Sequence, residues 1–182
     1  PWEGGGHLAD HAGGWSIVAP SAVAFGDALT KTPVELSPEA IARVQADFVA
    51  AAKRAVAAGY EWLELHSAHG YLSHEFLSPL SNRRTDRYGG SFENRIRFLL
   101  ETTRAVRAVW PEQLPFTVRL SCTDWVEGGW TIEESVELVR RLKTEGVDLI
   151  DCSSGGGVAA ARIPVGAGFQ VAFADRIRRE AG

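Results

Sequence analysis

A group of three side chains with useful chemistry lies where a predicted strand ends. His66 and His69 are three residues apart, and Tyr71 follows two residues later. Two neutral imidazoles that converge on one point could donate hydrogen bonds to a carbonyl oxygen and polarise it. A phenol beside them could supply a proton. The pattern therefore favours a site for carbonyl chemistry over histidines that merely cap a helix.

The same histidines also permit a metal site. His66, His69 and His74, together with Glu75, are residue types that bind zinc. The H-x-x-H spacing is weak evidence, however, and the H-E-x-x-H motif of zinc peptidases is absent from the sequence. We therefore predict no metal, and a metal-dependent hydrolase remains the alternative.

Arg119 is a third candidate because it interrupts an apolar strand between Val118 and Leu120. A charge in such a strand is costly unless it is paired or faces a ligand. An ion pair, for instance to Glu64 on a neighbouring strand, and a contact to a bound anion both stay open. The cysteines, Cys122 and Cys152, are interpreted as small buried residues at strand ends.

The elements that must position these residues alternate in type along the chain. Ser37, followed by proline, predicts a helix that ends at Gly59. Further helices are expected over 92–110, 131–146 and 169–180, and strands over 60–65, 116–120 and 147–152. Strict alternation predicts parallel βαβ units with helices on the faces of the sheet.

Three segments are expected to be irregular. Residues 1–36 are punctuated by glycine and proline and are predicted to form a long loop. The charged stretch 82–95 is interpreted as an ordered loop held by internal ion pairs. The glycines at 155–157 follow a strand but do not open a helix directly, so they are interpreted as a mobile loop and not as a phosphate cradle.

Composition limits the class of protein. The chain has 182 residues, 45% of them hydrophobic and 23% charged, which fits one globular domain. Its net charge of −4 does not suit electrostatic binding of nucleic acid. No apolar run approaches the roughly 20 residues of a membrane span. Two cysteines without a C-x-x-C motif, and no visible signal peptide, lead us to expect a cytoplasmic location.

The motifs together resemble the old yellow enzyme family of flavin-dependent ene reductases, in order along essentially the whole chain. The His-x-x-His pair resembles the bacterial class often called thermophilic-like, or NADPH dehydrogenase. The segments that carry the resemblance are 1–6, 18–22, 66–72, 75–79, 82–95, 116–121 and 148–155.

The resemblance implies a (β/α)₈ TIM barrel that holds FMN, with NADPH as hydride donor. It implies an enzyme that reduces the activated C=C bond of an α,β-unsaturated carbonyl compound, a small-molecule enone or enal. His66 and His69 match the residues that bind the substrate carbonyl. Tyr71 matches the proton donor, and Arg119 matches an arginine beside the flavin.

The resemblance also implies that the barrel is incomplete. Eight strand–helix units do not fit in 182 residues at the observed spacing. The whole of 1–182 is expected to be a partial barrel domain with about strands 4–6 and their flanking helices. The FMN phosphate-binding residues would lie elsewhere. A homo-oligomeric full-length parent is expected. A non-catalytic fragment and a relative acting on dienoyl thioesters remain alternatives.

Overall fold

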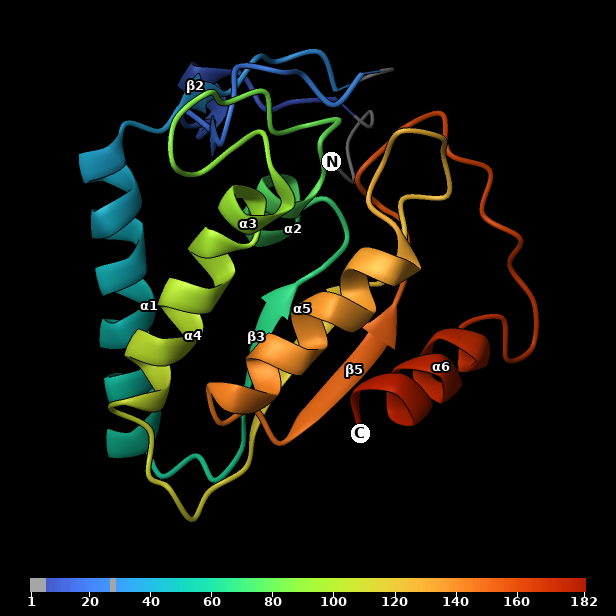
Figure 1. Cartoon of the computed structure of the whole chain (residues 1–182). Coiled ribbons are helices and arrows are strands. Elements are labelled where there is room, and N and C mark those ends of the chain that lie inside the picture. The colour runs from blue at the N-terminus through green and yellow to red at the C-terminus, as the bar shows by residue number, and fades with distance from the viewer. Residues whose placement is uncertain (1–5, 27–28) are drawn as a thin grey trace.

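The computed structural model describes residues 6–26 and 29–182, and its centre is a three-stranded parallel sheet. The strands lie in the order β3 (Leu63–Ser67), β4 (Phe116–Ser121) and β5 (Leu149–Ser153). Each strand is followed by helical connections, as the alternation of elements predicts. The strands point the same way, so their carboxyl ends meet at one edge (Figure 1).

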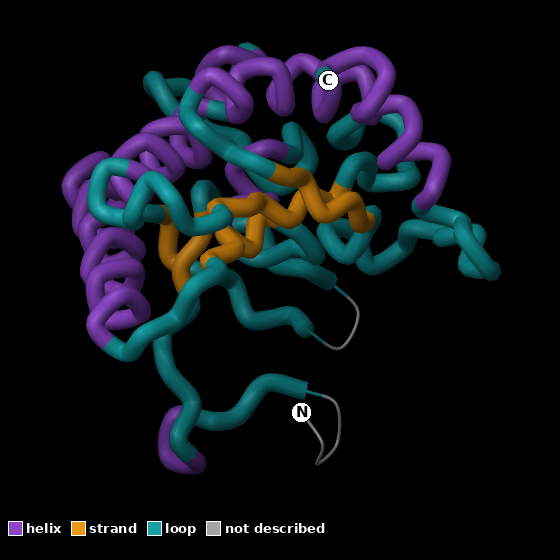
Figure 2. Tube along the Cα trace, turned by 90° about the horizontal axis from the view of Figure 1, so that it is seen from below, coloured by secondary structure: helices purple, strands orange, loops and turns teal. Residues whose placement is uncertain are grey.

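The longer helices gather around one face of the sheet (Figure 2). They are α1 (Pro38–Ala57), α4 (Arg97–Arg107), α5 (Ile132–Thr144) and α6 (Val171–Ala181). Leu65, Val118 and Ile150 are paired in register across the three strands and point into the apolar core under these helices. Because side chains alternate along a strand, the neighbouring residues project from the opposite face.

Two predicted helix starts are confirmed by their caps. The Ser37 hydroxyl accepts a hydrogen bond from the Ala40 amide at the start of α1. Thr131 and Glu134 form a reciprocal capping box at the start of α5. These bonds satisfy amide groups that the first helical turn leaves without partners, so both helices begin where the sequence indicates.

Three element predictions need correction. The first sheet strand begins at Leu63 and not at residue 60, because the Tyr60 amide is still bonded to the Ala55 carbonyl of α1. The helix expected over 92–110 is divided at Ile96 into α3 (Phe92–Arg95) and α4. A short helix, α2 (Leu72–Leu77), lies between the strand expected over 60–65 and the helix expected over 92–110, where no helix was predicted.

The N-terminal segment crosses the carboxyl ends of the strands (Figure 1). Its described residues include a 3-10 turn, η1 (Asp10–Ala12), and two short parallel strands, β1 (Val18–Ala19) and β2 (Val34–Glu35). Arg84 anchors it by donating to the carbonyls of Pro20 and Leu36, at 2.8 and 2.6 Å. The expectations for residues 1–5 and 27–28 lie outside the described residues.

The charged stretch 82–95 is an ordered loop, as predicted. Arg84 forms a two-pronged ion pair with Asp86, and buried Arg95 reaches Glu134 at the start of α5. Within the described ranges, no helix has both the length and the apolar character needed to cross a membrane.

Candidate functional site

Three polar side chains form one row across the sheet. The strand register aligns His66 with Arg119 and Arg119 with Asp151, and all three project from the face that lacks helices. The Nε of Arg119 lies 3.2 Å from the Asp151 carboxylate. The partner of Arg119 is therefore Asp151 and not Glu64, whose carboxylate accepts from the Thr117 hydroxyl instead.

The structure brings His66, His69 and Tyr71 together at the end of β3. The His66 ring centroid lies 5.1 Å from that of His69 and 5.5 Å from that of Tyr71. His66 and Tyr71 are exposed, and His69 is half-buried. In a parallel α/β fold, side chains at this edge of the sheet are those that meet a ligand.

A left-handed turn aims His69 toward this group. His69 has a φ of 60° and Gly70 a φ of 75°, so two successive residues adopt a conformation that L side chains rarely take. The His69 amide donates to the Ser121 hydroxyl at 2.9 Å, which holds the turn against the end of β4. A methyl group on Gly70 would lie 2.2 Å from the Gly156 carbonyl oxygen, so this position requires glycine.

The His69 ring is further tied to the end of β5. Its Nε2 lies 2.6 Å from the Ser153 hydroxyl oxygen, and that oxygen accepts a hydrogen bond from the side-chain amide of Gln170 at 3.3 Å. Burial lowers the pKa of His69, and the nearby Arg119 and His66 lower it further. His69 is therefore a neutral imidazole at neutral pH, suited to donating a hydrogen bond without carrying charge.

His74 does not join the other histidines. Its side chain is fully buried, its Nδ1 accepts from the Gly70 amide, and its Nε2 faces Asp124. Among residues 6–26 and 29–182, no group of three or more histidine, cysteine, aspartate or glutamate side chains could hold a metal ion. The arrangement that the metal-dependent hydrolase required is therefore not present in this part of the chain.

The glycines at 155–157 are packed, and the prediction of a mobile loop is wrong. The Gly155 amide donates to the Thr123 carbonyl at 2.8 Å, and its own carbonyl accepts from the Ser121 hydroxyl at 2.7 Å. A methyl group on Gly156 would lie 2.5 Å from the Cα of His69. This segment is glycine-rich because its backbone touches the His69–Gly70 turn.

A cavity of about 520 Å³ opens beside the site. His69, Tyr71 and Glu75 line one side, and Trp15 and Phe25 of the N-terminal segment line the other. Burial raises the pKa of Glu75 to about 7. The cavity thus combines apolar walls with a few polar groups, as small-molecule sites do.

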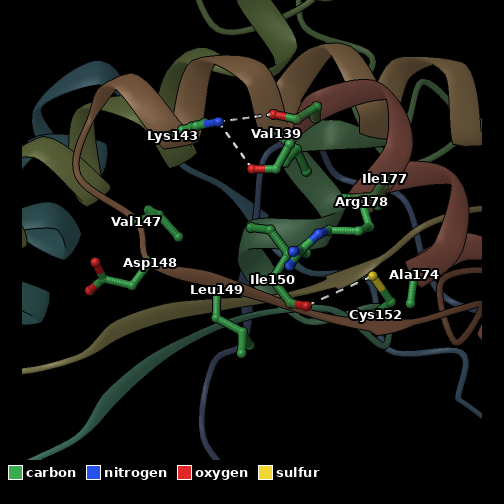
Figure 3. A pocket seen from close by; sticks show the side chains of 12 residues that line it. Val139, Lys143, Val147, Asp148, Leu149, Ile150, Cys152, Ala174, Ile177 and Arg178 are labelled. Atoms are coloured by element: carbon green, nitrogen blue, oxygen red, sulfur yellow. Dashed lines mark hydrogen bonds between the residues drawn. The ribbon is translucent and has the colours of Figure 1, made fainter.

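A second cavity, of about 370 Å³, lies between α5, α6 and β5 (Figure 3). Its walls include Ile150, Cys152 and Ile177. The Lys143 ammonium group, which also lines it, donates a hydrogen bond to the Gly182 carbonyl at 3.0 Å. None of the candidate residues at the carboxyl ends of the strands lines it.

Cys152 is half-buried, whereas Cys122 is buried at the end of β4 as predicted.

Four further polar residues contribute to the site in ways that the sequence did not predict: Ser121, Asp124, Ser153 and Gln170. Three of them follow or end a strand, and position at a strand end was the only signal available for them. Asp124 could be linked to His74 only through the structure, because the two are 50 residues apart in the chain.

Comparison with known proteins agrees with this geometry. Residues 2–179 match the model of the NADH:flavin oxidoreductase / NADH oxidase family. The chain is 52% identical to an NADPH dehydrogenase of Bacillus velezensis, over 91% of this chain and 48% of that protein. It is 45% identical to an NADH:flavin oxidoreductase of Gibberella zeae, over 96% of this chain and 46% of that protein. The chain thus spans about half the length of the curated relatives it matches.

Solved structures show the same fold. A 2-naphthoyl-CoA reductase in complex with 2-naphthoyl-CoA matches with a TM-score of 0.82 and 31% identity, over 91% of this chain and 26% of that one. Morphinone reductase in complex with tetrahydroNAD matches with a TM-score of 0.72 and 29% identity, over 92% of this chain and 48% of that one. The predicted incomplete (β/α)₈ barrel is confirmed, and the chain belongs to the NADH:flavin oxidoreductase / NADH oxidase family, which includes the old yellow enzymes.

Proposed function

We propose that the protein containing this chain is an NADPH-dependent FMN ene reductase, which reduces the C=C bond of an α,β-unsaturated carbonyl compound. The observation that carries the proposal is the gathering of His66, His69 and Tyr71 at the end of β3, beside Arg119. The relatives named NADPH dehydrogenase support the choice of hydride donor.

Arg119 fits a role in holding FMN. Its Nε is buried and makes no hydrogen bond of regular geometry among the described residues, although it lies 3.2 Å from the Asp151 carboxylate. The side chain is partly exposed on the helix-free face, in the row that starts at His66. A fixed cation there would stabilise negative charge on a bound ring. FMN, when bound, supplies the means of passing hydride from NADPH to the alkene.

His66 and His69 would bind the substrate carbonyl. As hydrogen-bond donors they would stabilise the negative charge that develops on its oxygen, which is the largest single effect in many such reactions. The contact between Ser153 and the Nε2 of His69 supports an arrangement in which the serine hydroxyl donates to that nitrogen. The Nδ1 of His69 would then carry the proton and serve as the donor to substrate.

Tyr71 would supply the proton to the substrate carbon next to the carbonyl. The side chain is 66% exposed and lines the 520 Å³ cavity. A phenol is a weak enough acid to stay protonated at neutral pH and still protonate an enolate.

The test measures reduction of cyclohexenone by NADPH in the FMN-loaded protein that contains this chain. Tyr71→Phe is expected to lower kcat by about tenfold to a hundredfold, because it removes the proton donor. His69→Ala is expected to raise KM by about tenfold, because it removes a hydrogen bond to the carbonyl. Tyr60→Phe is the control, since Tyr60 is equally exposed at 65% but lies between α1 and β3, at the opposite end of β3 from Tyr71.

Two results would contradict the proposal. Equal effects of the two tyrosine variants would remove Tyr71 from the reaction. A protein that does not retain the visible absorbance of FMN after desalting would favour the non-catalytic alternative.

We further propose a cytoplasmic, homo-oligomeric enzyme in which this chain is one partial barrel domain, with a small enone or enal as its substrate.

A further inference from the structure

His74 and Asp124 form a buried pair that the proposed reaction does not use directly. Both side chains are fully buried, and the Nε2 of His74 lies 3.0 Å from Oδ1 of Asp124. Neither of these two atoms makes a hydrogen bond of regular geometry among the described residues, so the contact between them is a close ion-pair contact. The second carboxylate oxygen accepts from the Ser78 hydroxyl at 2.6 Å and from the Trp130 amide at 2.8 Å. The pair is therefore fixed in orientation.

The other ring nitrogen of His74 holds a backbone group. The Gly70 amide donates to Nδ1 at 2.9 Å. A ring nitrogen that accepts a hydrogen bond carries no proton, so the proton of the His74 ring lies on Nε2, which faces Asp124. His74 thus connects a buried carboxylate to the amide directly after His69.

That amide belongs to the strained part of the site. His69 and Gly70 are both left-handed, and an L residue such as His69 keeps that conformation only where its surroundings impose it. The Ser121 hydroxyl holds the His69 amide, and His74 holds the Gly70 amide. Both amides of the turn are therefore bonded to side chains and not to a regular backbone partner.

We propose that His74, oriented by Asp124, is a positioning residue that holds the Gly70 amide and thereby fixes the His69 ring at the site. Its effect on carbonyl binding rests on the proposed function, whereas its effect on the turn does not. Asp124 follows β4, and a methyl group on Gly157, which follows β5, would lie 3.0 Å from Cε1 of His74. The pair thus lies among the segments that follow β3, β4 and β5, the three strands that carry candidate residues.

Two variants of His74 separate positioning from burial. In His74→Asn the side-chain oxygen takes the place of Nδ1, so the Gly70 amide keeps its acceptor and the contact to Asp124 is lost. In His74→Gln the side-chain nitrogen takes the place of Nε2, so Asp124 keeps its donor and the Gly70 amide loses its acceptor. Each variant removes one buried polar contact, so both are expected to lose thermal stability. The loss is expected to be larger in His74→Asn, because the group left without a partner there is a charged carboxylate.

Hydrogen exchange of the Gly70 amide, followed by NMR, is the first readout. We expect exchange to be about tenfold faster or more in His74→Gln than in His74→Asn, because only the former frees this amide. Equal exchange rates in the two variants would overturn the proposal. If either variant fails to fold, the unmodified protein is measured instead. We expect an NMR coupling across the hydrogen bond between the Gly70 nitrogen and Nδ1 of His74. A protonated Nδ1 would refute the proposal.

Enone reduction by the FMN-loaded protein is the second readout. His74→Gln is expected to raise KM by about tenfold, since a small displacement of a binding group has a large effect, while His74→Asn stays close to the unmodified protein. A KM that follows thermal stability in both variants would overturn the positioning role. If the unmodified protein reduces no enone, the proposed function fails, and Gly70 exchange still decides whether His74 holds the turn.

Discussion

At the scale of single residues, Glu75 links the cavity to the pH dependence of folding. Burial raises its pKa to about 7 from an ordinary value of 4.5. The folded state therefore binds this proton more tightly than the unfolded state does. Its contribution to stability is complete below the ordinary pKa and is lost as the pH rises through the folded-state value. We expect this group to lower the free energy of unfolding by up to about 3 kcal/mol over that interval.

Glu75→Gln tests this expectation because a neutral amide has no proton to lose. Urea denaturation at about pH 5 and about pH 8 should show a smaller difference in the variant than in the unmodified protein, with the variant more stable at the higher pH. Glu112→Gln is the control, since Glu112 is exposed. The same pH dependence in all three proteins would show that Glu75 is not the responsible group.

At the scale of elements, close contact between two loops shapes the site. Gly156 has a φ of 88°, and a methyl group there would meet the Cα of His69 at 2.5 Å. Gly128 has a similar φ of 73° but nothing within 4 Å of the corresponding position. The two glycines therefore share the backbone strain of an alanine substitution, and only Gly156 adds a clash.

Gly128→Ala is expected to cost about 1–2 kcal/mol, the strain of a left-handed L residue. Gly156→Ala is expected to cost more and also to shift the NMR resonances of the His69 ring, because backbone must move to admit the methyl group. Chemical denaturation and side-chain NMR spectra of both variants check this. An unchanged His69 spectrum in Gly156→Ala would mean that the loop adjusts without moving the turn.

The elements also show how much a sequence can predict. The starts of α1 and α5 followed from Ser37 and Thr131, because capping depends on residues three apart. The strand at Leu63 was placed too early, since Tyr60 and Trp62 have strand-like side chains but are exposed after the helix. Helix α2 was missed because its six residues are too few to show helical periodicity.

The sequence predicts only the part of the site whose residues lie close together in the chain. His66, His69 and Tyr71 lie within six positions of one another, so their proximity could be expected. The left-handed turn at His69 depends on Ser121, which comes from another strand. No sequence pattern connects residues 52 positions apart in this way, because tertiary packing sets their distance.

At the scale of the whole molecule, the sheet has two unlike faces and an edge at β5. The helices cover the face with Val118, and the row that contains Arg119 occupies the other. In the described part of the chain, β5 pairs only with β4, so its outer backbone groups have no strand beside them. Leu149 on β5 is 47% exposed and borders the 370 Å³ cavity. An apolar edge of this kind favours pairing with another chain.

We expect the chain on its own to associate through β5, and a lysine at the edge to oppose this. Leu149→Lys should reduce the concentration dependence of the apparent mass in analytical ultracentrifugation, because pairing would bury its charge. Val171→Lys is the matched control, since Val171 is 65% exposed but lies at the start of α6, away from the strand edge. An equal reduction by both lysines would indicate general charge repulsion between chains. Only a selective effect of Leu149→Lys assigns the association to the edge of the sheet at β5.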